Sequence, residues 1–415
     1  MITYQEAISL IDKVSLKLPN EKISILNSVS RVCTEDVLSP STNPSSSNTA
    51  FDGFAVIAKE TEGLSSQKTK RFKILRTIAA GDEPKINNYE KNSAAEVMTG
   101  GLVPKPFDSI IAVEKVKYFP TMEKATHIIV NEEVKQFSYI RFAGEDYNLK
   151  DVVIKKGELI QPKHIMAFTT LGIKDVLVKK QPKIIFFGTG SEIADYKDTK
   201  VSSWKVRNSN NHYFTSFGKS LYFKIIDGGI IKDNESDKLK QALNEALNSD
   251  TDIFVTSGAI SAGKFDFIPK LVKEFGFKTH FKGVAIKPGR PIMLSKFTQK
   301  EKLFFGLPGN PISCAAGFRF FIYPLIRNSL GMPKEKKFKA KLINEYSKKE
   351  KFTHFARSLM TINDQGLTEL EVLQGQQSNR IKSFVQANCW GIFSEDKEKF
   401  KSGDFIDWMP LIPSS

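Results

Sequence analysis

The stretch IFVTSGAISAGKFDF, residues 253–267, decides the fold that this sequence predicts. Its first four residues are apolar or β-branched, which is typical of a short buried strand. The run then breaks at Ser257, Gly258 and Gly263, where small residues let backbone N–H groups approach a ligand closely. Asp266 follows, at the start of a pattern compatible with a helix. A strand that passes through a small-residue loop into a helix is how open α/β sheets build sites for anionic ligands.

Two further loops of this kind follow along the chain. Residues 284–291 read VAIKPGRP, and residues 305–311 read FGLPGNP. In the first loop, Lys287 and Arg290 flank a Pro-Gly pair that fixes a turn and directs both cationic groups outward. A single Gly/Ser loop is often only a tight turn, and a pair of cations is often only surface charge. Three such loops, with these cations and Asp266 among them, favour a binding site.

Residues 183–330 alternate between strand and helix patterns. We expect strands at 184–187, 222–226 and 253–256, and helices over 208–219, over 237–248 and after Pro311. Alternation at this spacing predicts a largely parallel sheet with right-handed crossovers. Ligands of such sheets bind at the carboxyl ends of the strands, which is where the chain places Glu192, Ser257, Asp266 and Gly309.

The regions before residue 183 and after residue 330 show different sequence patterns. Residues 3–17 form an amphipathic pattern that predicts a helix, with Thr3 as its cap and Glu6 as the reciprocal partner. Between 51 and 139, short β-rich runs alternate with turns, which indicates a compact inserted module. From 338 onward, a small separate β-domain is predicted by short strand patterns at 339–343, 355–361, 367–372 and 405–409.

Composition narrows the classes of function. The chain has 415 residues, with 61 Lys+Arg against 46 Asp+Glu and a net charge of +15. Such a charge would suit a polyanion, but the basic residues are dispersed and no nucleic-acid-binding signature occurs, so we expect no nucleic-acid partner. The sequence shows neither a long apolar run nor a signal-peptide pattern, which predicts no membrane partner and a cytoplasmic location.

The three cysteines lack metal-ligand spacing and are predicted to be buried free thiols: Cys33, Cys314 and Cys389.

Three acidic residues, Glu192, Asp233 and Asp266, stand in loops beyond predicted strands. Each alone is more often a turn or helix-capping residue. Their common placement at one sheet edge favours Mg²⁺, because hard carboxylate oxygens that share coordination with a phosphate suit this ion. Ser257 has no nearby histidine and stands in no G-x-S-x-G elbow, so the pattern does not indicate a serine hydrolase.

Several motifs in combination resemble those of one family. Residues 48–56 read NTAFDGFAV, residues 98–104 read MTGGLVP and precede Glu114, and residues 141–146 read RFAGED. In the family's order there follow TGSE at 189–192, SN at 209–210, SG at 257–258, KPGRP at 287–291 and GLPGNP at 306–311. Over nearly its whole length the chain resembles the molybdopterin molybdenumtransferases, the MoeA/gephyrin E-domain family.

The resemblance implies a multidomain α/β plus β protein in four parts. Residues 1–50 with 140–180 would form an elongated, discontinuous linker domain, and residues 51–139 an inserted β-rich module. Residues 181–332 would form a molybdopterin-binding three-layer α/β domain with a parallel-rich sheet, and residues 333–415 a C-terminal β-barrel. The resemblance also implies a homodimer whose active site is shared, with the α/β domain of one subunit beside the inserted module of the other.

The activity that the resemblance implies is insertion of molybdate into Mg²⁺-bound adenylylated molybdopterin, which gives molybdenum cofactor and AMP. A molybdopterin adenylyltransferase is a candidate protein partner. The catalytic residues carried over are Asp52, Glu192, Asp266 and Lys287. The substrate-binding residues carried over are Thr99, Arg141, Asp146, Asn210, Ser257, Gly258, Gly263, Arg290, Gly309, Asn310 and Ser313. The metal ligands carried over are Asp233, Asp266 and Glu192.

Two departures from the family's pattern bear on molybdate binding. Many relatives carry a lysine four residues before Lys287, where this chain has Gly283 preceded by Lys282. Either Lys282 supplies that charge from a shifted position or the contact is absent. Phe142 and Ala143 stand where the family often has basic residues. The alternative function is a non-catalytic dimeric scaffold on the same fold, but a scaffold need not preserve metal ligands.

Overall fold

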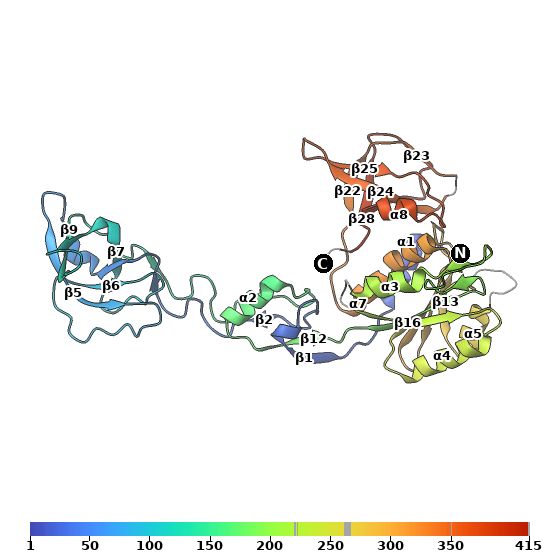
Figure 1. Ribbon diagram of the computed structural model, residues 1–415, viewed down its shortest axis with the longest axis horizontal. Coiled ribbons are helices and arrows are strands. Elements are labelled where there is room, and N and C mark those ends of the chain that lie inside the picture. Colours follow the sequence, from blue (N-terminus) through green and yellow to red (C-terminus); the bar gives the residue numbers. More distant parts are fainter. Residues whose placement is uncertain (220, 222, 261–266, 350, 414–415) are drawn as a thin grey trace. The chain divides into compact units, whose positions relative to one another are not determined.

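In the computed structural model, which Figure 1 draws as a ribbon coloured along the sequence, the chain divides into two compact units. The structure describes residues 1–219, 221, 223–260, 267–349 and 351–413. Unit 1 contains residues 1–35, 155–161 and 176–415, and unit 2 contains residues 36–154 and 162–175. Each unit is built around its own buried apolar clusters.

A six-stranded sheet forms the centre of unit 1. Four parallel strands lie in the order β16 (Lys224–Ile231), β13 (Lys183–Thr189), β17 (Ile253–Ser257) and β21 (Lys302–Leu307). Beyond β21 the sheet continues with β20 (Met293–Phe297), which is antiparallel to β21, and then with β18 (Lys278–Lys282), which is antiparallel to β20. The predicted parallel-rich sheet is confirmed, and the antiparallel pair is an addition that strand–helix alternation does not predict.

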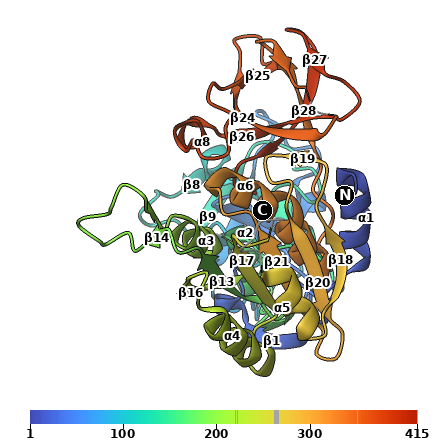
Figure 2. The same cartoon turned by 90° about the vertical axis from the view of Figure 1, so that its right-hand side faces the viewer.

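Helices cover both faces of this sheet, which makes three layers (Figure 2). Because successive strand residues point to opposite faces, Phe186 belongs to one apolar core and Phe187 to the other. The first core includes residues of α1 (Tyr4–Lys13), α3 (Asn210–Lys219), α6 (Pro311–Gly317), the π-helical turn η4 (Phe318–Ile322) and α7 (Tyr323–Ser329). The second core includes residues of α4 (Ser236–Asn248) and α5 (Ile268–Glu274).

The first helix begins with the predicted capping box. The Thr3 hydroxyl accepts a hydrogen bond from the Glu6 N–H at 3.2 Å, and the Glu6 carboxylate accepts one from the Thr3 N–H at 2.7 Å. The helix ends at Lys13 rather than at residue 17. The expected end was wrong because Val14, Leu16 and Leu18 are buried in alternation with exposed residues, which is the pattern of an extended segment.

The C-terminal residues of unit 1 form a closed five-stranded ring, which confirms the predicted β-barrel. Its order is β24 (Thr353–Ile362), β25 (Thr368–Val372), β22 (Phe338–Leu342), β28 (Phe405–Pro410) and β26 (Cys389–Phe393), and β26 pairs again with β24. Strand β19 (Ile286–Lys287) pairs with the start of β24, so the barrel is tied to the loop that carries Lys287. Smaller barrel elements are β23 (Tyr346–Ser347), β27 (Lys399–Phe400) and α8 (Lys382–Gln386).

Short elements join these larger parts. Those of unit 1 are η1 (Ile25–Asn27), the pair β1 (Asn20–Ser24) and β12 (Asp175–Lys179, whose first residue is assigned to unit 2), and the pair β14 (Ile193–Ala194) and β15 (Val206–Arg207). Those of unit 2 are α2 (Pro162–Thr170), the pair β2 (Val37–Leu38) and β11 (Val152–Ile154), and the pair β3 (Asn48–Thr49) and β10 (Ile140–Arg141). The last pair positions residues of the candidate site.

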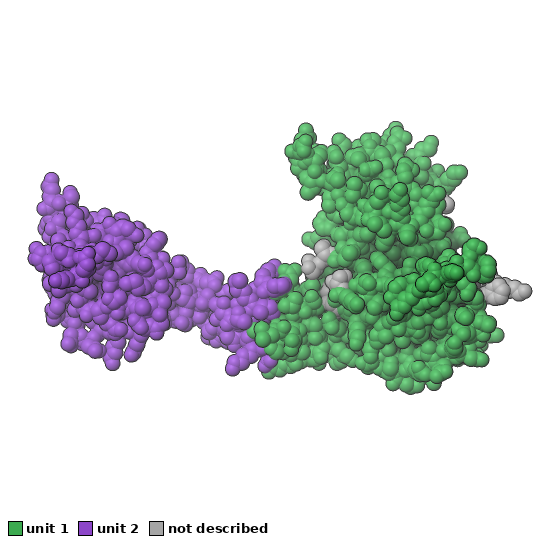
Figure 3. Space-filling view, in the orientation of Figure 1, with its two compact units in different colours: residues 1–35, 155–161, 176–415 green, residues 36–154, 162–175 purple. Residues whose placement is uncertain are grey.

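Unit 2, purple in Figure 3, contains a second six-stranded sheet. Its order is β7 (Ser109–Ala112), β4 (Gly53–Val56), β6 (Ser93–Val97), β5 (Lys70–Ile78), β9 (His127–Val130) and β8 (Lys117–Phe119). Two 3-10 turns accompany it, η2 (Ala58–Thr61) and η3 (Val113–Lys115). Phe54, Phe72 and Ile128 are fully buried in its core. The β-rich runs of the sequence form this sheet.

Two other expectations can be compared with the structure. Cys33, Cys314 and Cys389 are buried free thiols, as predicted. Burial raises the pKa of the Cys33 and Cys389 thiols to about 12. Among the described residues, the structure contains no helix with the length and apolar character needed to cross a membrane.

Candidate functional site

The carboxyl ends of β13, β16, β17 and β21 meet at one edge of the sheet. Gly258 follows β17 with a φ of +103°, and a Cβ on it would lie 2.5 Å from the carbonyl oxygen of Thr189. Only glycine fits this position. The Gly258 N–H donates to the carbonyl of Leu307 at 2.8 Å, and the Thr189 hydroxyl donates to the carbonyl of Ser257 at 2.9 Å. The loop is therefore fixed to both neighbouring strands.

Two carboxylates belong to the loops that follow β13 and β16. Asp233 accepts a hydrogen bond from the Ser191 N–H at 3.1 Å, and the Ser191 hydroxyl accepts one from the Asp233 N–H at 3.2 Å. Glu192 comes next, and its carboxylate folds over Gly190, where a Cβ would lie 2.5 Å from Oε2. Mg²⁺ is commonly held by one or two carboxylates together with water and substrate phosphate, so the chemistry of these side chains suits that ion. No cluster of three or more metal-ligating side chains occurs within the described ranges, which exclude 261–266.

Asn210, the first residue of α3, connects this edge to the next loop. Its side-chain amide donates to the carbonyl of Gly309 at 2.9 Å and to the hydroxyl of Ser257 at 3.4 Å. Asn210 is buried, so its bond to Ser257 is buried, whereas its bond to the exposed Gly309 is partly buried. The structure therefore brings together three residues that the sequence places far apart.

A pocket of about 450 Å³ opens beside Gly309. Its lining includes the predicted residues Lys287, Arg290, Asn310 and Ser313. Gly289 has a φ of +104°, and a Cβ on it would lie 3.2 Å from the carbonyl of Ser313, so glycine is required between the two cations. Two cationic side chains in a concave lining are suited to an oxyanion.

The C-terminal barrel contributes a wall of this pocket that the sequence analysis missed. Gln376, Gln377 and Ser378 belong to the lining, and the Asn310 amide donates to the Ser378 hydroxyl at 3.0 Å. The fully buried Arg357 holds this loop through hydrogen bonds to the carbonyls of Gly375 at 2.7 Å and Gln377 at 3.3 Å. Burial lowers the pKa of Arg357 to about 10, which leaves it protonated at neutral pH. The only local signal was the polar, glycine-containing run QGQQS at 374–378.

Unit 2 brings together two further predicted residues. One carboxylate oxygen of Asp52 accepts hydrogen bonds from the Thr99 hydroxyl at 2.7 Å and from the Thr99 N–H at 2.6 Å. These two bonds lower the pKa of Asp52, because they favour the ionised form. Both side chains are exposed. Asp52 is therefore an anion presented at the surface.

Arg141 and Asp146 lie in the neighbouring segment of unit 2. Arg141 pairs with Asn48 across β10 and β3, and Thr49, the other β3 residue, donates to the carbonyl of Gly101 at 3.0 Å. Strand β3 therefore lies between Arg141 and the turn that follows Thr99. Asp146 accepts a hydrogen bond from the Asn43 amide at 2.9 Å.

Three predictions concern the remaining residues. Gly263 and Asp266 lie outside the described residues. Gly283 has a φ of +80°, a conformation that favours glycine over the lysine found in many relatives. Lys282 ends β18 and does not belong to the described lining of the pocket with Lys287 and Arg290. This arrangement favours the alternative in which Lys282 does not replace the missing lysine and its contact with molybdate is absent.

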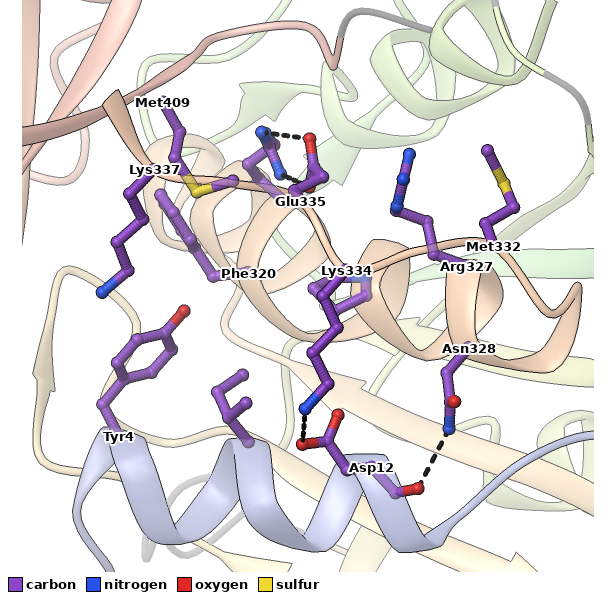
Figure 4. A pocket seen from close by; sticks show the side chains of 13 residues that line it. Tyr4, Asp12, Phe320, Arg327, Asn328, Met332, Lys334, Glu335, Lys337 and Met409 are labelled. Carbon is purple, nitrogen blue, oxygen red and sulfur yellow. Dashed lines mark hydrogen bonds and ion pairs between the residues drawn. The ribbon is translucent and has the colours of Figure 1, made fainter. Parts of the chain in front are cut away.

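A separate pocket of about 150 Å³ lies between α1 and α7 and holds none of the predicted site residues (Figure 4). Tyr4, Phe320 and Met409 form apolar parts of its lining. Arg319 binds the carboxylate of Glu335 through both terminal nitrogens, at 2.8 and 3.0 Å. This ion pair is nearly shielded from solvent.

Comparisons with known proteins cover most of the chain. Residues 2–172 match the MoeA N-terminal region (domain I and II), residues 186–328 match a probable molybdopterin binding domain, and residues 339–411 match the MoeA C-terminal region (domain IV). A molybdopterin molybdenumtransferase of Staphylococcus aureus is 29% identical over 413 residues, which are 98% of this chain and 94% of that protein. The protein of the same name from Haemophilus influenzae is 28% identical over 415 residues, 99% of each chain.

Solved structures agree with these matches. The molybdopterin biosynthesis moeA protein from Pyrococcus horikoshii OT3 superposes with a TM-score of 0.81 at 25% identity, over 98% of this chain and 99% of that chain. A molybdopterin-binding domain set between MoeA N- and C-terminal regions is the architecture of a class of molybdenum cofactor biosynthesis proteins. The chain belongs to the MoeA family.

Proposed function

We propose that the chain is a molybdopterin molybdenumtransferase, which inserts molybdate into adenylylated molybdopterin and releases AMP. Its curated relatives carry this name. The observation that carries the proposal is the hydrogen bond of 2.9 Å from Asn210 to Gly309. It joins the edge that bears carboxylates and glycine N–H groups to the cationic pocket. Groups suited to a metal-bound phosphoanhydride and groups suited to an oxyanion therefore belong to separate loops of the same unit.

Each predicted residue has a role that its chemistry supports. Lys287 and Arg290 bind molybdate in the pocket, with Asn310 and Ser313 as neutral hydrogen-bonding groups. At the strand ends, the phosphates bind to backbone and side-chain groups of Asn210, Ser257, Gly258 and Gly309. Preorganised donors of this kind stabilise charge that develops during reaction. Gly263 and Asp266 keep the substrate-binding, catalytic and metal-binding roles that the resemblance implies.

Glu192 and Asp233 would hold Mg²⁺, with Asp266 as a third ligand. A bound Mg²⁺ would neutralise charge on the phosphoanhydride and on the leaving phosphate. The two carboxylates in the strand-end loops support this choice, because Mg²⁺ takes oxygen ligands and keeps coordination positions for phosphate oxygens.

Unit 2 would complete the site in a homodimer. Asp52, Thr99, Arg141 and Asp146 are exposed polar residues with no catalytic partner in their own β-rich unit, as far as it is described. We place them in the active site of a second subunit. The four-part domain division, the cytoplasmic location and a molybdopterin adenylyltransferase partner belong to the same proposal.

The experiment measures AMP release from adenylylated molybdopterin, with Mg²⁺ and increasing molybdate. Wild-type protein should release AMP in a molybdate-dependent way. Lys287→Ala should raise the half-saturating molybdate concentration about tenfold or more, because a charge-assisted hydrogen bond contributes roughly 1.5–3 kcal/mol. Lys282→Ala is the matched control and should behave as wild type. Absence of AMP release by wild type, or equal behaviour of the two variants, would contradict the proposal.

A further inference from the structure

An exposed aromatic pair includes Phe51, the residue that precedes Asp52 in the chain. The rings of Phe51 and Tyr139 meet edge to face, with centroids 5.0 Å apart. Phe51 is 51% exposed and Tyr139 is 40% exposed. The Ala50 N–H donates to the Tyr139 carbonyl at 3.0 Å, so the two segments are held together by their backbones as well. A large aromatic ring at the surface leaves apolar area in water unless something covers it.

The backbone that presents Tyr139 is strained. Phe137 and Tyr139 have φ values of +67° and +56°, which bulky side chains rarely adopt. The Phe137 N–H donates to the Asp108 carbonyl at 3.0 Å, and the Ile110 N–H donates to the Ser138 carbonyl at 3.0 Å. These bonds fix the turn in place. Such strain often occurs at ligand-binding sites, where it holds a side chain in a productive position.

A second aromatic pair ends the same segment. Phe137 and Phe142 meet edge to face with centroids 5.4 Å apart, and both side chains are about half exposed. In the segment 137–142, Arg141 thus lies between the exposed aromatic residues Tyr139 and Phe142 in the sequence.

We propose that Phe51 and Tyr139 form a stacking surface for the pterin ring of the substrate, and that Asp52 forms hydrogen bonds with the edge of that ring. This inference rests on the proposed function and deepens it. One ring stacks on the pterin face, while the Asp52 carboxylate accepts hydrogen bonds from the pterin N3–H and the adjacent amino group. Arg141 lies beside them to pair with the phosphate of the same molecule.

The chemistry of Asp52 selects pterin over adenine. A carboxylate is only an acceptor, and it pairs best with two neighbouring donors. The pterin edge offers two such donors side by side, whereas the adenine edge alternates its amino donor with ring-nitrogen acceptors. Both Thr99 bonds go to one oxygen of Asp52, and among the described residues its other oxygen has no hydrogen-bond partner. The depressed pKa of Asp52 keeps the acceptor ionised.

The test titrates the full chain with two separate probes, 6-hydroxymethylpterin, followed by its fluorescence, and AMP. Phe51→Leu and Tyr139→Leu should each raise the pterin Kd about tenfold, since stacking of a base on an aromatic side chain is worth roughly 1–3 kcal/mol. Phe51→Tyr should keep wild-type affinity, because it keeps the ring. Asp52→Asn should weaken pterin binding, and the AMP Kd should not change in any of these variants.

The control is Phe338→Leu, because Phe338 is also about half exposed and packs against an aromatic ring, Trp408, but on the C-terminal barrel. It should leave pterin binding unchanged. Three outcomes would overturn the inference: no pterin binding by wild type, equal loss in Phe338→Leu, or a change of oligomeric state in Phe51→Leu by sedimentation with no change in pterin affinity. The last would make the surface an interface between copies. Molybdate-dependent AMP release by wild type tests the proposed function independently of all three.

Discussion

Asn210 and Gly309, which are 99 residues apart in sequence, are joined by a hydrogen bond of 2.9 Å from the side-chain amide to the carbonyl oxygen. The bond fixes the start of α3 to the loop before α6. It therefore sets where the cationic pocket stands relative to the carboxyl ends of β13 and β17. This relationship underlies the proposed function, since both groups of residues must act on one substrate.

Asn210→Ala should reduce both stability and activity. An intramolecular hydrogen bond contributes about 1 kcal/mol, and the Gly309 carbonyl would lose its side-chain partner. We expect a Tm lower by about 2–4 °C and a clear loss of AMP release, measured by calorimetry and by the AMP assay. The exposed Asn234→Ala is the control and should change neither. A variant at 210 with wild-type Tm and activity would contradict this role.

Glu192 and Asp233 should govern the response to Mg²⁺. Each of Glu192→Gln and Asp233→Asn removes one hard anionic ligand, so the Mg²⁺ concentration for half-maximal AMP release should rise. Asp237→Asn, an exposed residue in the first turn of α4, should leave it unchanged. The outcome that excludes this site is an unchanged Mg²⁺ requirement in both ligand variants.

Thr99 should control the pKa of Asp52. Its two hydrogen bonds lower this pKa in the folded state. The stabilisation is therefore present above the unfolded-state value, about 3.9, and is lost as pH falls through the lower folded-state pKa. Thr99→Val removes the hydroxyl and should raise the Asp52 pKa toward its ordinary value in a carbon-13 NMR titration. Thr99→Ser keeps the hydroxyl and should stay close to wild type; identical titrations of both variants would refute the assignment.

The ion pair between Arg319 and Glu335 should be much more important for stability than an exposed pair. Arg319 is 2% exposed and Glu335 is 14% exposed, so Glu335→Ala leaves a buried, uncompensated guanidinium. We expect a loss of about 3–5 kcal/mol in the free energy of unfolding. Glu90→Ala breaks the exposed pair with Lys73 and should cost about 1 kcal/mol or less. Denaturation experiments that give equal losses would contradict this account.

The features of the fold that could be predicted from the sequence are those that depend on local patterns of residues. Alternating strands and helices indicate a parallel sheet, and a parallel sheet brings its carboxyl ends together, so the neighbourhood of Ser257 and Gly309 follows. The capping box of Thr3 and Glu6 is likewise local. The end of the first helix at Lys13 was missed because Val14, Leu16 and Leu18 fit both an amphipathic helix and a strand-like alternation.

The features of the site that could not be predicted depend on contacts between residues far apart in the sequence. The loop of Gln376 to Ser378 reaches the pocket of Lys287 only because the barrel closes and β19 pairs with β24. Nothing in the run QGQQS indicates that a buried Arg357 will hold it. Similarly, the sequence marks Asp52 and Thr99 by family motif, but the exposed aromatic rings beside Asp52 become visible only when Tyr139 is brought to Phe51.

The measurement that tests the central claim most directly is the ratio of molybdenum incorporated to AMP released in a single turnover. Purified protein would be mixed with one equivalent of adenylylated molybdopterin, Mg²⁺ and molybdate. The account predicts one molybdenum bound to molybdopterin for each AMP, and a product that activates an apo-molybdoenzyme. AMP release with no molybdenum in the product, or no AMP release at all, would contradict it.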